Sequence, residues 1–470
     1  MPNESSIAQV IVEGLHNQFD VEINLLPGLN VLYGKNGRGK TTLLHLLANL
    51  LELDFGRFQF LQFHKIRVST SLGDVVEILK SQGDLPPIVL LNNNAISLSG
   101  GNPGLFEAEI SNLRTVLGPR PTYLPAFRSI LERVRSDSTI YYRSERRDSE
   151  AEELIARESA ALKELAAGMQ SASAYMTRQL QEEAQTTAEK TVLCRQWFGR
   201  FVPVIRYPSV ADVEDSLSEE WRRAAIEISG REQKMFEETF VKIFRIVSGL
   251  ENSPTTESNE DLLASISSLL TDPELQIAQN DSRAVFNKLQ ESARLLTASN
   301  SSLRGIDKSL LELYKKLLED RNSERKTAFQ KSRDFEASIN SFLDNKTLRI
   351  GVSPERPRSR ATVAISTANG QSYGLSALSS GERQILTMLY SASRTRFQPG
   401  LFLIDEPELS LHIDWQRKIL RELQKQSPDR QIIACTHSPE VGADHFLEIQ
   451  DFEPTPITRQ QESLFTDDEI

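Results

Sequence analysis

One stretch constrains the fold of this chain more than any other: GKNGRGKT, at residues 34–41. It matches the pattern G-x-x-x-x-G-K-[ST] and lies between an apolar run at 28–34, which predicts a buried strand, and the apolar segment TTLLHLLANLL, which predicts a buried helix. A strand, a glycine turn and a helix N-terminus aim successive backbone N–H groups at one point. The sequence therefore predicts a phosphate-binding loop in an α/β domain.

The pattern also predicts how this loop binds its ligand. The Lys40 ammonium is expected to reach the outer phosphates of a nucleotide, and the Thr41 hydroxyl is expected to bind Mg²⁺. The residues expected to bind the nucleotide are Gly34, Lys35, Asn36, Gly37, Arg38, Gly39, Lys40, Thr41 and Thr42.

Composition narrows the class of protein. The net charge of −11, from 54 Lys and Arg against 65 Asp and Glu, argues against a surface that binds nucleic acid everywhere, but it leaves room for a local basic groove. The two distant cysteines, Cys194 and Cys435, cannot form a disulfide framework, so we expect a cytoplasmic protein. No apolar run approaches about 18 residues, so no membrane segment is expected.

Strand patterns occur at both ends of the chain and flank a long helical middle. Residues 7–25 alternate as two strands, which we expect to join, antiparallel, the sheet that carries the phosphate loop. Further strands are predicted at 57–69, 86–92, 121–129, 347–353 and 361–374, the last with a hairpin turn at Asn369-Gly370. We expect one α/β domain with a mixed sheet and helices, in two parts, 1–133 and 346–470, separated by a helical insertion at 134–345.

Two apolar seams predict that the insertion is partly coiled coil. We expect two antiparallel arm helices that pair through these seams, with a small helical tip between them. A compact helical lid is the alternative, because two heptads are short for a free-standing coiled coil. The seams are Leu162, Leu165, Met169, Ala172 and Met176, and Leu303, Ile306, Leu310, Leu313 and Leu317.

Two acidic residues follow a predicted buried strand in the C-terminal part. The apolar run at 401–404 ends directly at Asp405 and Glu406. A carboxylate at the end of such a strand can bind Mg²⁺, and a second one beside it can orient and deprotonate a water for attack on a γ-phosphate. We assign Asp405 to the metal and Glu406 to the water.

Two polar turns accompany these acids. The segment LSSGE opens a predicted helix and offers hydroxyl and N–H groups to an anion. His437 follows a predicted buried strand, where its ring could donate a hydrogen bond to a γ-phosphate, so we group it with Lys40 and Glu406 as catalytic. The residues of the LSSGE turn that matter here are Ser379, Ser380, Gly381 and Glu382.

The phosphate loop, LSSGE, LIDEPE and THS, in this order and with a helical insertion between the first two, resemble the ABC-type ATPases of the SMC and DNA-repair branch. The segments DEPELSLHIDWQ and THSPEV are similar to those of AAA ATPases of bacterial anti-phage defence systems. The ATPase subunit of the PARIS system is the most similar type, and Septu-type ATPases come next.

The resemblance implies an ATPase that binds ATP and Mg²⁺ and releases ADP and phosphate. It implies that Ser379 and Gly381 act in trans on the nucleotide of a second copy, in a head-to-tail dimer or higher homo-oligomer with residues 408–412 as the D-loop at the interface. It further implies a sensor and scaffold that controls a separate toxic effector, expected to be a nuclease, when a phage protein acts as trigger.

Some features of this family are absent or unassigned in the sequence. No Cys-x-x-Cys occurs in the insertion, so no zinc hook is expected. Ser380 and Glu382 stand where transporter members have Gly and Gln, which argues against a transporter motor, as does the long insertion. No Q-loop glutamine is identified, and Arg128 is our candidate for a residue that couples the nucleotide to the insertion. The segment after THSPEV is too short for a fused nuclease domain, so we expect any nuclease on a separate subunit.

A DNA-repair or DNA-clamping ATPase that acts directly on DNA is the alternative function. Two arginine clusters could contact DNA phosphates, although solvated faces with neighbouring acids would give the same pattern. Salt-dependent DNA binding that stimulates hydrolysis would favour this alternative. The clusters are Arg128, Arg133, Arg135, Arg143, Arg146 and Arg147, and Arg356, Arg358 and Arg360.

Overall fold

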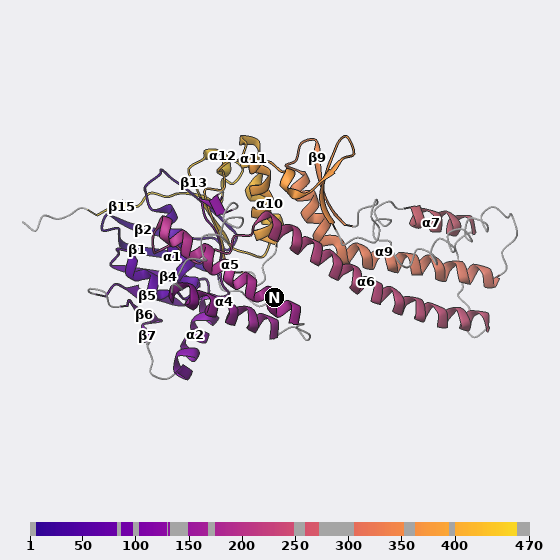
Figure 1. Cartoon of the computed structure of the whole chain (residues 1–470), viewed down its shortest axis with the longest axis horizontal. Helices are drawn as coiled ribbons and strands as arrows, with labels where there is room; N and C mark the ends of the chain where they lie inside the picture. The colour runs from indigo at the N-terminus through magenta and orange to yellow at the C-terminus, as the bar shows by residue number, and fades with distance from the viewer. Residues whose placement is uncertain are drawn as a thin grey trace, which may run out of the picture. The chain divides into compact units, whose positions relative to one another are not determined.

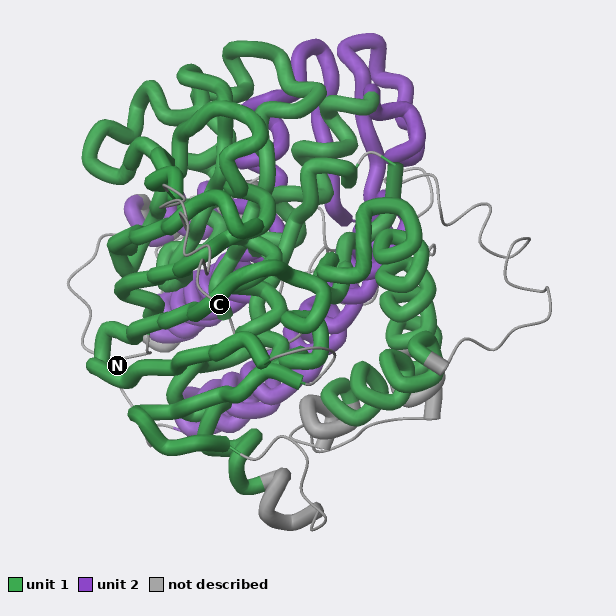
Figure 2. Tube along the Cα trace, turned by 90° about the vertical axis from the view of Figure 1, so that its left-hand side faces the viewer, with its two compact units in different colours: residues 1–209, 380–470 green, residues 210–379 purple. Residues whose placement is uncertain are grey.

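The computed structural model divides into two compact units, residues 1–209 with 380–470 and residues 210–379 (Figure 2). These boundaries differ from the expected division at 133/134 and 345/346, because two helices of the middle segment pack in the first unit and three later strands pack in the second. The structure describes residues 6–81, 86–96, 103–128, 130–131, 149–167, 174–248, 259–271, 305–351, 362–393 and 400–457.

The first unit contains two sheets (Figure 1). The larger one is antiparallel, in the order β15-β2-β1-β4-β5-β6-β7. Its strands are β1 (Ile7–Leu15), β2 (Phe19–Asn24), β4 (Lys65–Thr70), β5 (Val75–Leu79), β6 (Ile88–Leu91), β7 (Asn94–Ile96) and β15 (Thr455–Pro456).

The second sheet of this unit carries the phosphate loop, and all its strands are parallel. Its order is β14-β3-β13-β12-β8. The expectation that β1 and β2 join this sheet is wrong, because both strands pair in the antiparallel sheet, between β4 and β15. The strands are β3 (Leu29–Tyr33), β8 (Thr122–Leu124), β12 (Phe402–Asp405), β13 (Ile432–Thr436) and β14 (Ile449–Asp451).

The register of the parallel sheet brings three strand ends together. Asp405 pairs with Cys435, and Cys435 pairs with Leu32, so β3, β12 and β13 end at one edge. Ligands of open α/β sheets bind outside the carboxyl ends of the strands. The chain segments that follow these three strands therefore define where a site can form.

Several helices complete the first unit. The segment 57–69, predicted as one strand, is instead a 3₁₀ helix followed by β4, and buried Phe55 and Phe58 follow a period of three rather than two. The helices are α1 (Lys40–Leu51), η1 (Phe55–Phe60), α2 (Pro103–Leu117), α4 (Ser149–Ala167), α5 (Ala174–Phe198), α10 (Ser380–Ser393), α11 (Ile413–Gln426) and α12 (Pro439–Gly442).

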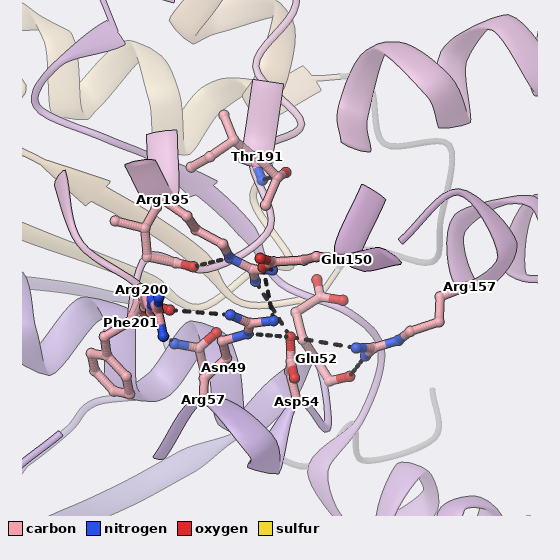
Figure 3. Close-up of polar contacts among 12 residues, drawn as sticks. Asn49, Glu52, Asp54, Arg57, Glu150, Arg157, Thr191, Arg195, Arg200 and Phe201 are labelled. Atoms are coloured by element: carbon pink, nitrogen blue, oxygen red, sulfur yellow. Dashed lines mark hydrogen bonds and ion pairs between the residues drawn. The ribbon is translucent and has the colours of Figure 1, made fainter. Parts of the chain in front are cut away.

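Ion pairs attach α4 and α5 to the end of α1 (Figure 3). Arg195 of α5, 3 % exposed, lies 3.4 Å from Asp54 and 2.9 Å from Glu150 of α4. Arg206 forms a bidentate pair with Glu52, at 2.5 and 3.0 Å. Because Arg195 and Glu52 are buried, removal of the partner of either would leave an uncompensated buried charge.

The second unit is built on two long antiparallel helices, α6 (Val210–Val247) and α9 (Gly305–Asn340), with α7 (Asn259–Thr271) beside α9. Trp221 stacks on Phe329 at 4.0 Å between ring centroids. Further along, Glu232 accepts hydrogen bonds from Arg321 at 2.9 Å and from Arg325 at 2.6 Å.

Where the structure describes them, the helices that carry the two predicted seams have other partners. Leu162 is buried on α4 in the first unit, and the partner of α9 is α6. On α9, Leu317 of the predicted seam is buried, and its neighbours Leu311 and Leu318 pack on Ile266 of α7. The side chains of Leu165, Met169, Ala172, Met176, Leu303 and Ile306 lie outside the described residues.

A small sheet of order β11-β10-β9 completes the second unit. It is separate from the sheet that carries the phosphate loop, which corrects the expectation of one continuous sheet. The predicted hairpin is confirmed, and Gly370 has a φ of 75° in its turn. The elements are β9 (Lys346–Gly351), β10 (Thr362–Thr367), β11 (Ser372–Tyr373) and η3 (Leu375–Ala377). In the described part of the chain, no helix is long and apolar enough to cross a membrane.

Candidate functional site

The loop between β3 and α1 has the geometry that its glycines predict. Gly39, which precedes α1, has a φ of 95°, a conformation that residues with a side chain rarely adopt. At Gly34 a Cβ atom would lie 2.8 Å from the Phe452 carbonyl oxygen, so only glycine fits. The Lys40 side chain is 5 % exposed and its ammonium donates to the carbonyls of Gly34 at 2.6 Å and Lys35 at 3.1 Å. The loop thus surrounds the Lys40 ammonium.

Thr41 and Asp405 meet beside this lysine. The Thr41 hydroxyl donates a hydrogen bond of 2.8 Å to Oδ2 of Asp405, which is completely buried. Burial raises the pKa of Asp405 to about 6, and its other oxygen, Oδ1, has no hydrogen-bond partner among the described residues. A hydroxyl and a carboxylate with one unpartnered oxygen are the ligands that Mg²⁺ prefers. These residues therefore fit a magnesium ion.

Glu406 lies next to both the lysine and the predicted histidine. Its carboxylate is 3.9 Å from the Lys40 ammonium and hydrogen-bonds to Nδ1 of His437. Burial and the adjacent Glu408 carboxylate raise the pKa of Glu406 to about 7. Its φ of 49° is in the left-handed region, where a residue with a side chain carries strain.

Glu408 anchors the segment that carries the histidine. Its Oε1 accepts hydrogen bonds from the Thr436 hydroxyl at 2.5 Å and from the backbone N–H groups of His437 and Ser438, both at 3.0 Å. In the sequence, Glu408 is predicted only as part of the D-loop, and this anchoring role is not predicted. Glu408, the third acid in DEPE, was itself the available signal, since a buried carboxylate must find donors.

Arg128 is also part of this site, and it is completely buried. Its guanidinium donates to the carbonyls of Asp405 and Glu406, both at 2.9 Å. It is therefore excluded from the expected DNA-contacting cluster. The other arginines of the two clusters, Arg133, Arg135, Arg143, Arg146, Arg147, Arg356, Arg358 and Arg360, lie outside the described residues.

The LSSGE turn lies where α10 begins. Ser380 is the first residue of α10, and Ser379 directly precedes it at the end of the second unit. Gly381 lies against the expected D-loop, because a Cβ atom there would be 2.8 Å from the Ser410 carbonyl oxygen. The action of this turn on the nucleotide of a second copy stays a prediction.

Comparison with known proteins gives matches to one family and to several relatives. Residues 212–444 match the family model "AAA domain, putative AbiEii toxin, Type IV TA system", a range that contains LSSGE, Asp405, Glu406 and His437 but not the phosphate loop. The chain is 32% identical over 153 residues to "Retron Ec83 probable ATPase" of Escherichia coli, covering 28% of this chain and 27% of that one. It is 37% identical over 90 residues to "Septu protein PtuA" of Bacillus thuringiensis, covering 16% and 22%. It therefore spans about a quarter of the length of the curated relatives it matches.

Comparison with solved structures gives weak matches to Smc head domains. One, from Pyrococcus yayanosii, has a TM-score of 0.39 and 13% identity and covers 97% of each chain. Another, from Pyrococcus furiosus, has a TM-score of 0.38 and 12% identity, covering 94% of this chain and 92% of that one. Residues 212–444 are therefore similar to an AAA domain of the AbiEii type, and parts of the chain are similar to retron ATPases and to a Septu protein.

Proposed function

We propose that this protein binds ATP with Mg²⁺ and hydrolyses it to ADP and phosphate at the edge of the parallel sheet. One observation carries the proposal: residues 40–41 and 405–406, far apart in the sequence, meet there through the contacts between Thr41 and Asp405 and between Lys40 and Glu406. A buried lysine at a helix N-terminus beside two carboxylates is the arrangement that positions a triphosphate for attack by water.

Each residue has a distinct role in this proposal. Lys40 binds the outer phosphates, and Thr41 and Asp405 hold the metal ion. Magnesium, when bound, neutralises charge on the phosphate oxygens. Glu406 accepts a proton from the attacking water, and the pKa of about 7 supports this role because a general base works best when its pKa is near the working pH. His437 binds Glu406 in this structure, and its ring is 44 % exposed, so in this proposal it turns from Glu406 to donate to a γ-phosphate.

The complete site contains residues of a second copy. We propose that residues 379–382 of one copy close over the nucleotide of another, so that ATP joins the two in a head-to-tail dimer. The exposed Ser380 at the start of α10 supports this, because a helix N-terminus attracts a phosphate. Dimers of this kind can assemble further into a larger homo-oligomer.

The biological role that we propose is an ATP-dependent sensor and scaffold in anti-phage defence. The protein would hold a separate effector, a nuclease, and release it when a phage protein is detected. The retron and Septu relatives support this role, and the buried free thiols of Cys194 and Cys435 suit the reducing cytoplasm.

Two experiments test this proposal at separate levels. Purified protein should release phosphate from ATP only with Mg²⁺, and the absence of turnover would refute the hydrolytic step. A pull-down of the neighbouring operon product, with wild type and with Glu406→Gln, tests the scaffold role. Capture of a partner that depends on the nucleotide is expected, and capture of none would remove the scaffold role while leaving hydrolysis intact.

A further inference from the structure

Two buried arginines form hydrogen bonds at opposite ends of β12, the strand that ends in Asp405. Arg430, 5 % exposed, donates to the Gly400 carbonyl at 2.7 Å, just before the strand begins. Arg128 is completely buried. It donates to the carbonyl of Asp405, the last residue of the strand, and to that of Glu406, the first residue of the following turn. Only the second arginine touches the residues proposed to act on ATP.

The contacts of Arg128 are concentrated on three successive carbonyls. Its Nη1 donates to Asp405 at 2.9 Å, and its Nη2 donates to Glu406 at 2.9 Å and to Pro407 at 3.2 Å. A planar guanidinium carries five N–H donors in a fixed fork, so it can hold several carbonyls in one geometry, whereas an ammonium cannot. These contacts define the orientation of the turn at 405–407.

The backbone of Glu406 is held from both sides. The Glu406 N–H donates to the Cys435 carbonyl at 2.8 Å. The carbonyls of Asp405 and Glu406, one on each side of the Glu406 Cα, accept hydrogen bonds from Arg128. For a residue with a side chain, the left-handed backbone conformation is unfavourable by about 1 kcal/mol or more. It persists only when surrounding contacts fix it. Arg128 supplies this constraint for the φ of 49° at Glu406.

Burial of a guanidinium is itself unfavourable. The Arg128 guanidinium is completely buried, so its charge has lost its hydration by water. An apolar side chain would fill the same volume without that cost. Packing alone therefore does not explain an arginine here.

We infer that Arg128 is a positioning residue for ATP hydrolysis: its guanidinium holds the 405–407 turn so that the Glu406 carboxylate faces the attacking water. This inference rests on the proposed function, because it requires Glu406 to act on that water. It assigns Arg128 no contact with ATP.

Arg128→Lys and Arg430→Lys form a matched pair for the test. Each substitution removes a buried guanidinium that forms hydrogen bonds at one end of β12. Each is expected to lower the melting temperature of the protein. For Arg128→Lys we expect kcat to fall at least about 10-fold while KM for Mg-ATP stays within about 3-fold, because misplacement of a catalytic group affects turnover more than binding. For Arg430→Lys we expect kcat to stay within about 2-fold of wild type.

Two outcomes would overturn the inference: a folded Arg128→Lys with wild-type kcat, or an equal loss of kcat in both variants. Should Arg128→Lys not fold, Arg128→Gln, which keeps two N–H donors without charge, is judged by the same two outcomes. Glu406→Gln separates this inference from the proposed function. If Glu406→Gln turns over ATP normally, the proposed function fails; if it is inactive while Arg128→Lys is fully active, only the role of Arg128 fails.

Discussion

The Thr41 hydroxyl donates a hydrogen bond of 2.8 Å to the Asp405 carboxylate, across 364 residues of sequence. It joins the end of the phosphate loop to the end of β12, and the carboxylate that it orients is completely buried. One hydroxyl therefore links the two distant parts of the site.

Thr41→Val and Thr41→Ser separate the shape of this side chain from its hydroxyl. Valine keeps the branched shape but removes the hydrogen bond and the metal ligand, so we expect the Mg²⁺ concentration for half-maximal ATPase activity to rise at least about 10-fold, the effect of roughly 1.4 kcal/mol. Serine keeps the hydroxyl and should stay close to wild type. A magnesium titration of the ATPase rate measures both, and equal curves for Val and wild type would remove Thr41 from the metal site.

Glu408→Leu should disturb the histidine segment. It leaves three donors without their acceptor, so we expect a loss of about 2–4 kcal/mol in the free energy of unfolding and a clear drop in kcat. Glu440→Leu is the control, because the partner of Glu440 is the exposed Arg417. This variant should lose less than about 1 kcal/mol in the free energy of unfolding. Urea unfolding and ATPase assays measure these effects, and equal losses in both variants would contradict the anchoring role.

Glu232→Gln should destabilise the second unit. The variant leaves Arg321 and Arg325 buried without their carboxylate, and breaking a buried pair costs about 3–5 kcal/mol. Glu227→Gln removes an ion pair with Arg231 at the surface of the same helix and should change stability by less than about 0.5 kcal/mol. Denaturant unfolding followed by circular dichroism compares the two variants. A small effect in both would show that the buried charges are not coupled.

Because of His45, we expect the free energy of unfolding of the first unit to decrease as the pH falls. It lies in α1 with its ring hydrogen-bonded to the Tyr123 hydroxyl at 2.8 Å, and burial lowers its pKa from 6.5 to about 3. Between these values the unfolded chain binds a proton that the folded protein does not, so stability falls as the pH drops below 6.5. Over pH 7 to 5 this group removes about 2 kcal/mol.

Unfolding at pH 7 and pH 5 checks this prediction. His45→Gln should lose about 2 kcal/mol less than wild type over that range, because glutamine does not titrate. The same substitution at an exposed histidine, His64→Gln, serves as control for the change of residue itself. An unchanged pH dependence in His45→Gln would contradict the assignment.

The parts of the fold that sequence could predict are those fixed by local pattern. The strand, glycine turn and helix around Lys40, and the buried strand before Asp405, were predicted because hydrophobic runs and glycines specify them within about ten residues. Sheet membership was not predictable in this way. Nothing in the alternation of β1 and β2 shows that β14 and β13 occupy both sides of β3.

The same limit applies to the site. Lys40, Glu406 and His437 were found from their motifs, whereas the anchoring role of Glu408 depends on donors 28–30 residues away. Arg128 was singled out as a residue that couples the nucleotide to the insertion. Its carbonyl contacts lie about 280 residues away, and only the folded chain reveals them.

If the phosphate loop and the acids after β12 enclose one triphosphate, Lys40→Ala and Glu406→Gln must fail in different ways. Both can be followed in one experiment, in which labelled ATP is added with Mg²⁺ and the protein-bound nucleotide and its ADP fraction are measured after gel filtration. We expect Lys40→Ala to retain no nucleotide, and Glu406→Gln to elute as a dimer with intact ATP, hydrolysing it at least about 100-fold more slowly than wild type. Near-normal ADP formation by Glu406→Gln, or normal ATP binding by Lys40→Ala, would contradict a shared site.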